Sequence, residues 1–148
     1  MIDISFKKLI SEAIIPTRAT PGSSGFDLYG VQPFDQGVTW VFEPGDIFEI
    51  PTGIALQLPL GMEGQVRSRS GLASKGLVVA NSPGTIDSDY RGQIIVLLAN
   101  IGRSKLLVNH GERVAQLVIC PVLNACFVEV EQLTNSDRGV GRFGSTGR

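Results

Sequence analysis

The chain has 148 residues, which suits one domain and leaves no room for two of ordinary size. Hydrophobic residues make up 43% of it, enough to fill a core, so a largely disordered chain is excluded. The formal net charge of −1 argues against non-specific nucleic-acid binding, which needs a clustered positive field, although a few gathered arginines would still bind a small anion.

Short apolar or alternating runs, each closed by Gly, Pro, Asn or Asp, follow one another along the chain and predict strands rather than helices. In chain order the predicted strands are residues 2–6, 38–42, 47–50, 54–58, 65–67, 77–79, 94–99, 106–108, 114–119 and 127–130. Turn residues separate them; at 43–46, for example, Pro44 presets φ and Gly45 tolerates a positive φ. Many short strands with such turns predict an all-β sandwich, barrel or jelly roll.

Two segments depart from this pattern. A single helical turn is expected to start near Ser70, with Gly76 as its C-terminal stop. Residues 138–148 contain four glycines and three arginines around one aromatic residue, Phe143, and have almost nothing to bury. We expect a mobile tail that becomes ordered over an anionic ligand.

The cysteines and the N-terminus give no sign of a secreted or membrane protein. Cys120 and Cys126 lack CxxC spacing and have no histidine beside them, so free buried thiols are expected rather than a zinc site. Lys7 and Lys8 follow the first apolar residues instead of preceding them, and no long apolar run occurs. The sequence therefore predicts a cytoplasmic protein without a membrane partner.

Five patches carry more polar chemistry than a plain β-domain needs: residues 19–28, 69–73, 81–92, 111–117 and the tail. Arg69 and Ser70, at the start of the helical turn, offer a guanidinium, a hydroxyl and free backbone N–H groups, all suited to phosphate. Asp87 and Asp89 lie two residues apart, and we expect one carboxylate to face a pocket and orient a water while the other is turned outward. Phosphoryl chemistry needs such an aligned nucleophile together with charge neutralisation.

Taken singly, each patch has an ordinary structural explanation. Arg-Ser-Gly occurs in many turns, Asp87 would serve equally well as a structural partner of an arginine, and Glu112 with Arg113 fits a surface ion pair. In this order and spacing, however, the patches resemble the five motifs of the trimeric dUTPase family. The strings Arg-Ser-Gly-Leu-Ala at 69–73, Gly-Thr-Ile-Asp-Ser-Asp-Tyr-Arg-Gly at 84–92 and Phe-Gly-Ser-Thr-Gly at 143–147 carry the resemblance over nearly the whole chain.

This resemblance implies a jelly-roll-like β-barrel over residues 1–136, assembled as a threefold trimer, and a flexible Gly/Arg-rich C-terminal arm over residues 137–148. Each active site in such a trimer draws on three chains. The implied reaction is Mg²⁺-dependent hydrolysis of dUTP to dUMP and pyrophosphate by attack of water on the α-phosphorus. It keeps uracil out of DNA and supplies dUMP for thymidylate synthesis.

The resemblance also implies residue roles. Asp87 would activate the attacking water and contact the sugar 3′-hydroxyl, while Tyr90 would pack on the deoxyribose and exclude a 2′-hydroxyl. The remaining substrate contacts would come from Asn81, Thr85, Ile86 and Ile95 around the uracil, from Arg69, Ser70, Gly71 and Gln116 on the phosphates, and from Arg138, Phe143, Gly144, Ser145 and Thr146 in the arm. Mg²⁺ would be held mainly by the phosphates, with Asp27 either touching its water shell or orienting an arginine.

The sequence departs from the family's arm motif at one position, and two alternative functions have to be weighed. Arg142 stands where the family's arm motif has glycine, which either strains the arm or strengthens its hold on phosphate. A dCTP deaminase would share the fold but would need a carboxylate near the cytosine amino group, and the sequence offers no dedicated candidate. A non-catalytic nucleotide sensor is disfavoured because Asp87, Ser70 and Gln116 are all present.

Overall fold

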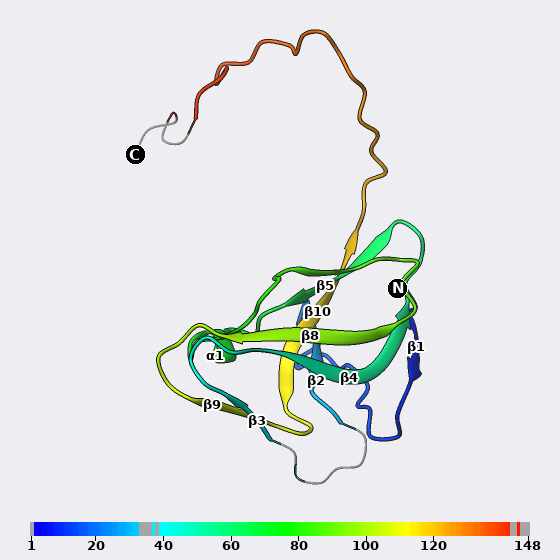
Figure 1. Ribbon diagram of the computed structural model, residues 1–148. Helices are drawn as coiled ribbons and strands as arrows, with labels where there is room; N and C mark the ends of the chain where they lie inside the picture. Colours follow the sequence, from blue (N-terminus) through cyan, green and yellow to red (C-terminus); the bar gives the residue numbers. More distant parts are fainter. Residues whose placement is uncertain (1, 33–36, 38, 143–144, 146–148) are drawn as a thin grey trace.

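The computed structural model describes residues 2–32, 37, 39–142 and 145, which form ten strands and one helical turn. The elements are β1 (Ser5–Lys8), β2 (Phe26–Tyr29), β3 (Thr39–Phe42), β4 (Ile47–Gln57), β5 (Met62–Arg67), α1 (Ser70–Ala73), β6 (Leu77–Val79), β7 (Gly84–Ile86), β8 (Gln93–Asn100), β9 (Leu106–Asn109) and β10 (Arg113–Pro121). One four-stranded sheet has the order β1-β4-β8-β6, a second has the order β2-β10-β5-β7, and β3 pairs with β9 (Figure 1).

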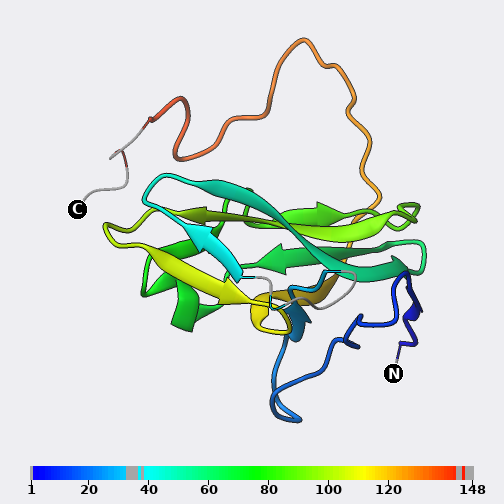
Figure 2. The same cartoon turned by 60° about the horizontal axis from the view of Figure 1, so that its bottom comes forward.

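The all-β class is therefore confirmed, and every pairing between these strands is antiparallel. The sheets do not close into a barrel, however. β1 and β6 are the edges of one four-stranded sheet, and β2 and β7 are the edges of the other. Within the described chain the expected barrel is thus two open sheets that face each other (Figure 2).

The core lies between the two four-stranded sheets, is completed by side chains of β3 and β9, and follows from strand alternation. In β3, for example, Trp40 and Phe42 are buried while Thr39 and Val41 are exposed. The buried residues that the sheets contribute include Leu28, Val66, Val114 and Leu117 from one sheet and Ile50, Ile54, Ile94, Val96 and Leu98 from the other. Burial of these apolar side chains supplies the main driving force for folding.

β4 is one long strand with an interruption, where the sequence predicted two strands at 47–50 and 54–58. Its pairing with β8 shifts between Pro51 and Ala55. Pro51 has no N–H to donate to the ladder, and Gly53 takes a φ of +68°. The Gly53 N–H donates instead to Gln93 Oε1 at 2.9 Å. The strand therefore continues past the irregularity, with β8 on one side and β1 on the other.

Turn predictions at glycine are confirmed. Gly45 has a φ of +94°, between β3 and β4, and Gly76 has a φ of +98°, just after the α1 turn.

Residue 38 of the predicted strand 38–42 lies outside the described residues. Two strands were not predicted as such: β2, which the sequence showed only as a loop entering a strand, and β7.

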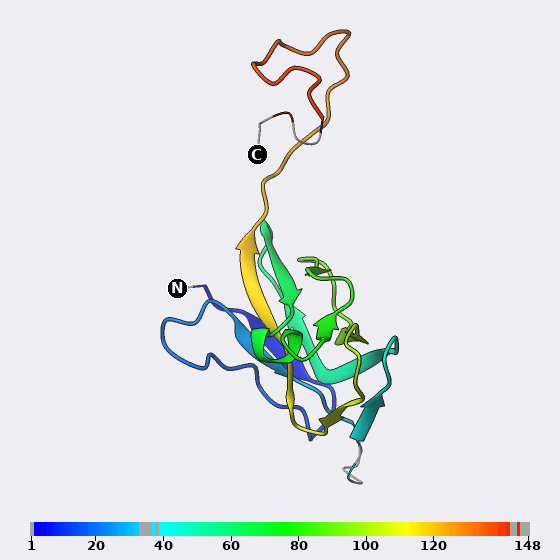
Figure 3. The ribbon, with the colours of Figure 1, turned by 90° about the vertical axis from the view of Figure 1, so that its left-hand side faces the viewer.

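The predicted strand at 127–130 is wrong. β10 ends at Pro121, and the chain then leaves the sheets as an extended segment (Figures 1 and 3). Phe127, Val128 and Val130 are all exposed there. Apolar alternation alone does not make a strand, because the backbone also needs a hydrogen-bonding neighbour, and this segment has none within the described chain.

Candidate active site

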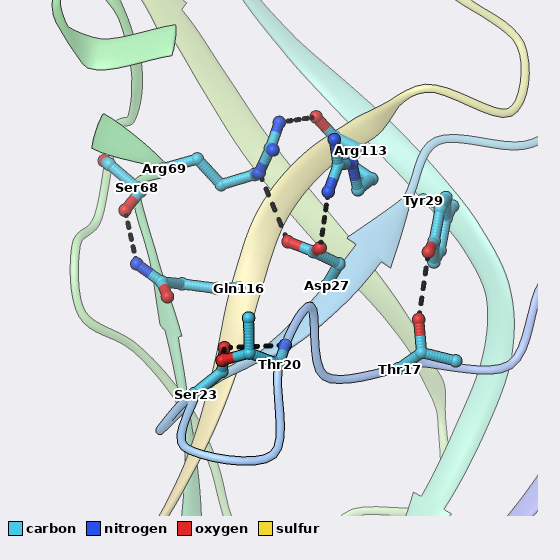
Figure 4. Close-up of polar contacts among 9 residues, drawn as sticks. All are labelled: Thr17, Thr20, Ser23, Asp27, Tyr29, Ser68, Arg69, Arg113 and Gln116. Carbon is cyan, nitrogen blue, oxygen red and sulfur yellow. Dashed lines mark hydrogen bonds and ion pairs between the residues drawn. The ribbon is translucent and has the colours of Figure 1, made fainter. Parts of the chain in front are cut away.

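Asp27 on β2 holds two arginines that come from distant parts of the chain. Its Oδ1 lies 3.2 Å from Nε of Arg69, and its Oδ2 lies 3.1 Å from Nη1 of Arg113 (Figure 4). Arg69 Nη1 also donates to the Arg113 carbonyl at 2.9 Å. The Asp27 side chain is only 14% exposed, so solvent screens these contacts less than it screens a surface pair. Of the two roles left open for Asp27, the geometry favours orienting arginines.

The Arg113 contact differs from the expected surface pair with Glu112. Glu112 Oε1 instead accepts a hydrogen bond from Asn109 Nδ2 at 3.0 Å, within the turn between β9 and β10. Arg113 pairs with Asp27 because β10 lies beside β2, a neighbour far away in sequence. Sequence reasoning therefore missed Arg113 as a member of the charged cluster.

Gln116 on β10 is fixed beside the same cluster. Its Nε2 donates to the Ser68 carbonyl at 3.0 Å, which leaves its second N–H and its Oε1 for a ligand (Figure 4). The Ser68 Oγ accepts a hydrogen bond from the Val79 N–H at 2.8 Å, which fixes Ser68, the residue before Arg69, against β6. A Cβ at Gly25 would lie 2.7 Å from Gln116 Oε1, which explains the glycine in the first patch.

Arg69 is also the N-cap of α1, which places Ser70 and Gly71 in the first turn. A Cβ at Gly71 would meet no atom within 4 Å, so the backbone there is open to an approaching group. Asp27, Arg69 and Arg113 line a pocket of about 440 Å³, whose other lining residues are Thr17, Ala19, Tyr29, Leu72, Gly111 and Glu112. We call it the arginine pocket.

A second pocket of about 290 Å³ lies where β7 passes β8. It is lined by Glu49, Val66, Asn81, Gly84, Thr85, Ile86, Asp87, Tyr90, Gln93, Ile95 and Leu97, and we call it the hairpin pocket. All six residues expected around the nucleoside are among them, whereas Asp89 is not. Glu49 is a further member that the sequence did not indicate.

Tyr90 is held in place in the connection between β7 and β8. Its hydroxyl donates to the Gln93 carbonyl at 2.9 Å, and its N–H donates to the Asp87 carbonyl at 3.2 Å. A Cβ at Gly92 would collide with the Tyr90 ring, so glycine is needed for this packing. Tyr90 is 43% exposed, so it is available to a ligand.

The arm residues lie apart from both pockets in the described chain. Arg138 Nε donates to the Gly141 carbonyl at 3.4 Å, and the Ser145 N–H donates to the Arg142 carbonyl at 3.1 Å. Phe143, Gly144 and Thr146 lie outside the described residues. Figure 1 shows the segment that leads to the arm arching away from the sheets.

The described residues contain no group of three or more His, Cys, Asp or Glu side chains that could hold a metal ion. Asp27, the one candidate from the sequence, already has both oxygens paired with guanidinium groups. A divalent ion at this site would therefore need its ligands mainly from a bound substrate and water. Within the same part of the chain, no helix is long and apolar enough to cross a membrane.

The family model described as dUTPase matches residues 11–147. The deoxyuridine 5′-triphosphate nucleotidohydrolase of Nautilia profundicola is 46% identical over 146 residues, covering 98% of this chain and 99% of that protein. The protein of the same name from Hydrogenobaculum sp. is 50% identical over 142 residues, covering 95% of each chain.

The chain is also similar to solved structures of dUTPases. A mutant Staphylococcus bacteriophage 80alpha dUTPase with dUpNHpp matches with a TM-score of 0.88 at 28% identity, covering 100% of both chains. A mutant dUTPase from phage phi11 of S. aureus, described for its coordination of a structural Mg(II) ion, matches with a TM-score of 0.78 at 25% identity. That match covers 88% of this chain and 98% of the phage protein.

Proposed function

Because the chain belongs to the dUTPase family, we propose that it hydrolyses dUTP to dUMP and pyrophosphate by attack of water on the α-phosphorus. The observation that carries the proposal is the composition of the two pockets. The hairpin pocket has no lysine or arginine among its lining residues and suits a neutral nucleoside. The arginine pocket is lined by two guanidinium groups and by the carboxylates of Asp27 and Glu112. Asp27 occupies only part of the N–H donors of each arginine, so the remaining donors suit phosphates.

In the hairpin pocket, Asp87 orients and activates the attacking water and contacts the 3′-hydroxyl. Its exposed carboxylate is free to accept a hydrogen bond from a water, which is the first requirement for this role. Tyr90 packs on the deoxyribose and leaves no room for a 2′-hydroxyl. The hydrogen bond from its hydroxyl to the Gln93 carbonyl prevents the ring from turning aside.

Base recognition uses the rest of the same pocket. Asn81, Thr85, Ile86 and Ile95 surround the uracil, with main-chain groups of the hairpin reading its edge. The Asn81 amide lies over Gly84. A Cβ at residue 84 would be 3.1 Å from Asn81 Nδ2, so glycine leaves room for the Asn81 amide.

Phosphate binding uses Arg69, Ser70, Gly71 and Gln116. Asp27 keeps the Arg69 guanidinium directed by its ion pair, and Ser68 keeps the Gln116 amide directed through its carbonyl. Mg²⁺, when bound by the substrate phosphates, neutralises part of their charge. Chelation by EDTA is accordingly expected to abolish turnover, and added Mg²⁺ is expected to restore it.

The proposal extends to a threefold trimer with shared sites, because the two pockets have no lining residue in common. One chain supplies the hairpin pocket, a second supplies the phosphate-binding residues, and a third lends its arm. Exposed apolar residues such as Leu60, Leu123 and Phe127 give such an assembly surface to bury. Arg138, Phe143, Gly144, Ser145 and Thr146 then close over the nucleotide. The cytoplasmic location expected from the sequence stays a prediction.

The position of attack is tested by hydrolysis in ¹⁸O-labelled water. The proposal requires the label to appear in dUMP, because the water oxygen joins the α-phosphorus. Label in the pyrophosphate would place the attack on the β-phosphorus and contradict the proposed role of Asp87. Absence of dUTP hydrolysis in the presence of Mg²⁺ would overturn the proposed function itself.

A further inference from the structure

The pairing of β4 with β8 is interrupted at residues 52–54, which stand opposite a single residue of β8, Ile94. Residues that bulge out of a ladder leave main-chain groups that need other partners. The Thr52 hydroxyl donates to the Ile94 carbonyl at 2.6 Å. The Gly53 N–H donates to Gln93 Oε1 at 2.9 Å. The Gln93 side chain thus ties the interrupted part of β4 to the first residue of β8.

Gln93 also holds the residue that we propose selects the sugar. Its carbonyl accepts the hydrogen bond of 2.9 Å from the Tyr90 hydroxyl. The Tyr90 ring packs on Gly92, the residue before Gln93, where a Cβ would collide with it. The ring therefore rests on two consecutive residues, and its position depends on how firmly Gln93 itself is held.

The strand that holds Gln93 is β4. Gln93 begins β8, and the first residue of a strand is prone to local opening. On the other side of β8, β6 pairs only with residues 98–100, so within the described chain β4 is the strand beside Gln93. Gly53 is buried, and its N–H would lack this acceptor if the Gln93 side chain lost its oxygen.

The geometry points to Gln93 as a positioning residue for sugar selection, which accepts the Gly53 N–H and so fixes the surface on which the Tyr90 ring rests. The inference rests on the proposed function, since it takes Tyr90 as the residue that excludes a 2′-hydroxyl. Gln93 acts through Tyr90 and needs no contact of its own with the nucleotide. Once Gln93 is loosened, the ring yields to the larger sugar, and the ribonucleotide binds more readily.

The test is Gln93→Met, which has nearly the same length but only a weak hydrogen-bond acceptor. Affinities are measured for dUpNHpp, a dUTP analogue, and for its ribose counterpart UpNHpp. We expect the ratio of the two affinities to fall about threefold. The fall should be larger than in Tyr90→Phe, which keeps the ring on Gly92, and smaller than in Tyr90→Ala.

Two further variants separate the hydrogen bond from other effects. Gln93→Glu keeps the oxygen acceptor and is expected to retain the wild-type ratio. Its added charge acts on both affinities alike, because the two nucleotides carry the same charge. Gln57→Met makes the original change at an exposed position of β4 outside the hairpin pocket and is expected to match the wild type. Thermal unfolding of each variant shows whether the fold is retained.

The double variant Gln93→Met/Tyr90→Ala shows whether Gln93 acts through the ring. With the ring absent, the substitution of Gln93 is expected to leave the affinity ratio at the value of Tyr90→Ala alone. A further fall would overturn the inference, since Gln93 would then contact the ribose itself.

An unchanged ratio in Gln93→Met would also overturn the inference, as would an equal fall in Gln93→Glu. Binding of the two imido analogues requires no hydrolysis, so these outcomes are separate from the proposed function. That function fails if the wild-type protein does not hydrolyse dUTP.

Discussion

Asp87 and Tyr90 come from one short stretch between β7 and β8, and each has a separate task in the proposed reaction. Asp87 is exposed in the pocket and available to a water, whereas Tyr90 is held by its hydroxyl and its N–H. Chemistry and sugar selection therefore depend on different side chains a few residues apart. Substitutions are expected to separate the two effects.

Asp87→Asn is expected to reduce turnover at least a hundredfold, because the amide cannot take the proton of the attacking water. Affinity for dUpNHpp should change little, since the phosphate-binding residues lie elsewhere. Single-turnover hydrolysis and equilibrium binding measure the two quantities. Asp89→Asn, outside the hairpin pocket, serves as the control. Normal turnover in Asp87→Asn would remove Asp87 from its role.

Tyr90→Ala is expected to let UTP compete with dUTP, with the preference for dUTP falling roughly tenfold or more because the ring no longer blocks the 2′-hydroxyl. Tyr90→Phe keeps the ring and loses only the hydrogen bond to Gln93, so it should retain most of the preference. Ratios of kcat/KM for the two nucleotides measure this. If Tyr90→Ala discriminates as well as the wild type, the steric explanation fails.

At the scale of elements, strands and turns were largely predictable where local chemistry decides them. Gly45 and Gly76 take positive φ as expected, and α1 begins at Ser70. The segment at 127–130 has strand alternation but no neighbour to pair with in the described chain, and β7 has too few residues to show a pattern. Pairing between distant strands is a tertiary property that alternation does not reveal.

The candidate site likewise contains residues that could be predicted from the sequence and residues that could not. Residues inside the family-like strings, such as Asp87 and Tyr90, were expected in one pocket and do line it. Glu49 and Arg113 were missed because their positions follow from strand neighbours: Glu49 faces Leu97 across β4 and β8, and Arg113 reaches Asp27 from β10. No local signal in the sequence marks Glu49, and the patch at 111–117 indicated Arg113 only as a surface partner of Glu112.

The arm is the element whose function is most separable from the fold. Deleting residues 138–148 removes none of the buried core and is expected to lower kcat at least tenfold while leaving the unfolding temperature unchanged. Steady-state kinetics and thermal unfolding of the truncated protein measure this. Val140→Ala, an exposed position in the arm, is the control. Unchanged kinetics in the truncated protein would show that the arm takes no part.

On the scale of the whole molecule, the arginine pocket and the hairpin pocket are separate in one chain. In the proposed trimer, a shared site would join them by taking one pocket from each of two subunits. This arrangement also gives the exposed apolar residues a partner surface. It predicts that two inactive variants, with substitutions in different pockets, regain activity when they assemble together.

Arg69→Gln and Asp87→Asn are each expected to be almost inactive alone. In mixed trimers of the two variants, about one third of the sites would combine an intact hairpin with an intact phosphate-binding patch, so activity should return. Co-expression with two different tags isolates the mixed assembly. If each site were built within one chain, every site would carry a defect and no activity would return.

The central claim is that this chain selects the base and the sugar of dUTP and splits off pyrophosphate. The most direct measurement is pyrophosphate release from dUTP, UTP, dCTP and dTTP in parallel, at equal concentrations with Mg²⁺. The account predicts strong release from dUTP and little from the other three nucleotides. Comparable release from UTP or dCTP, or binding of dUTP without any release, would contradict it.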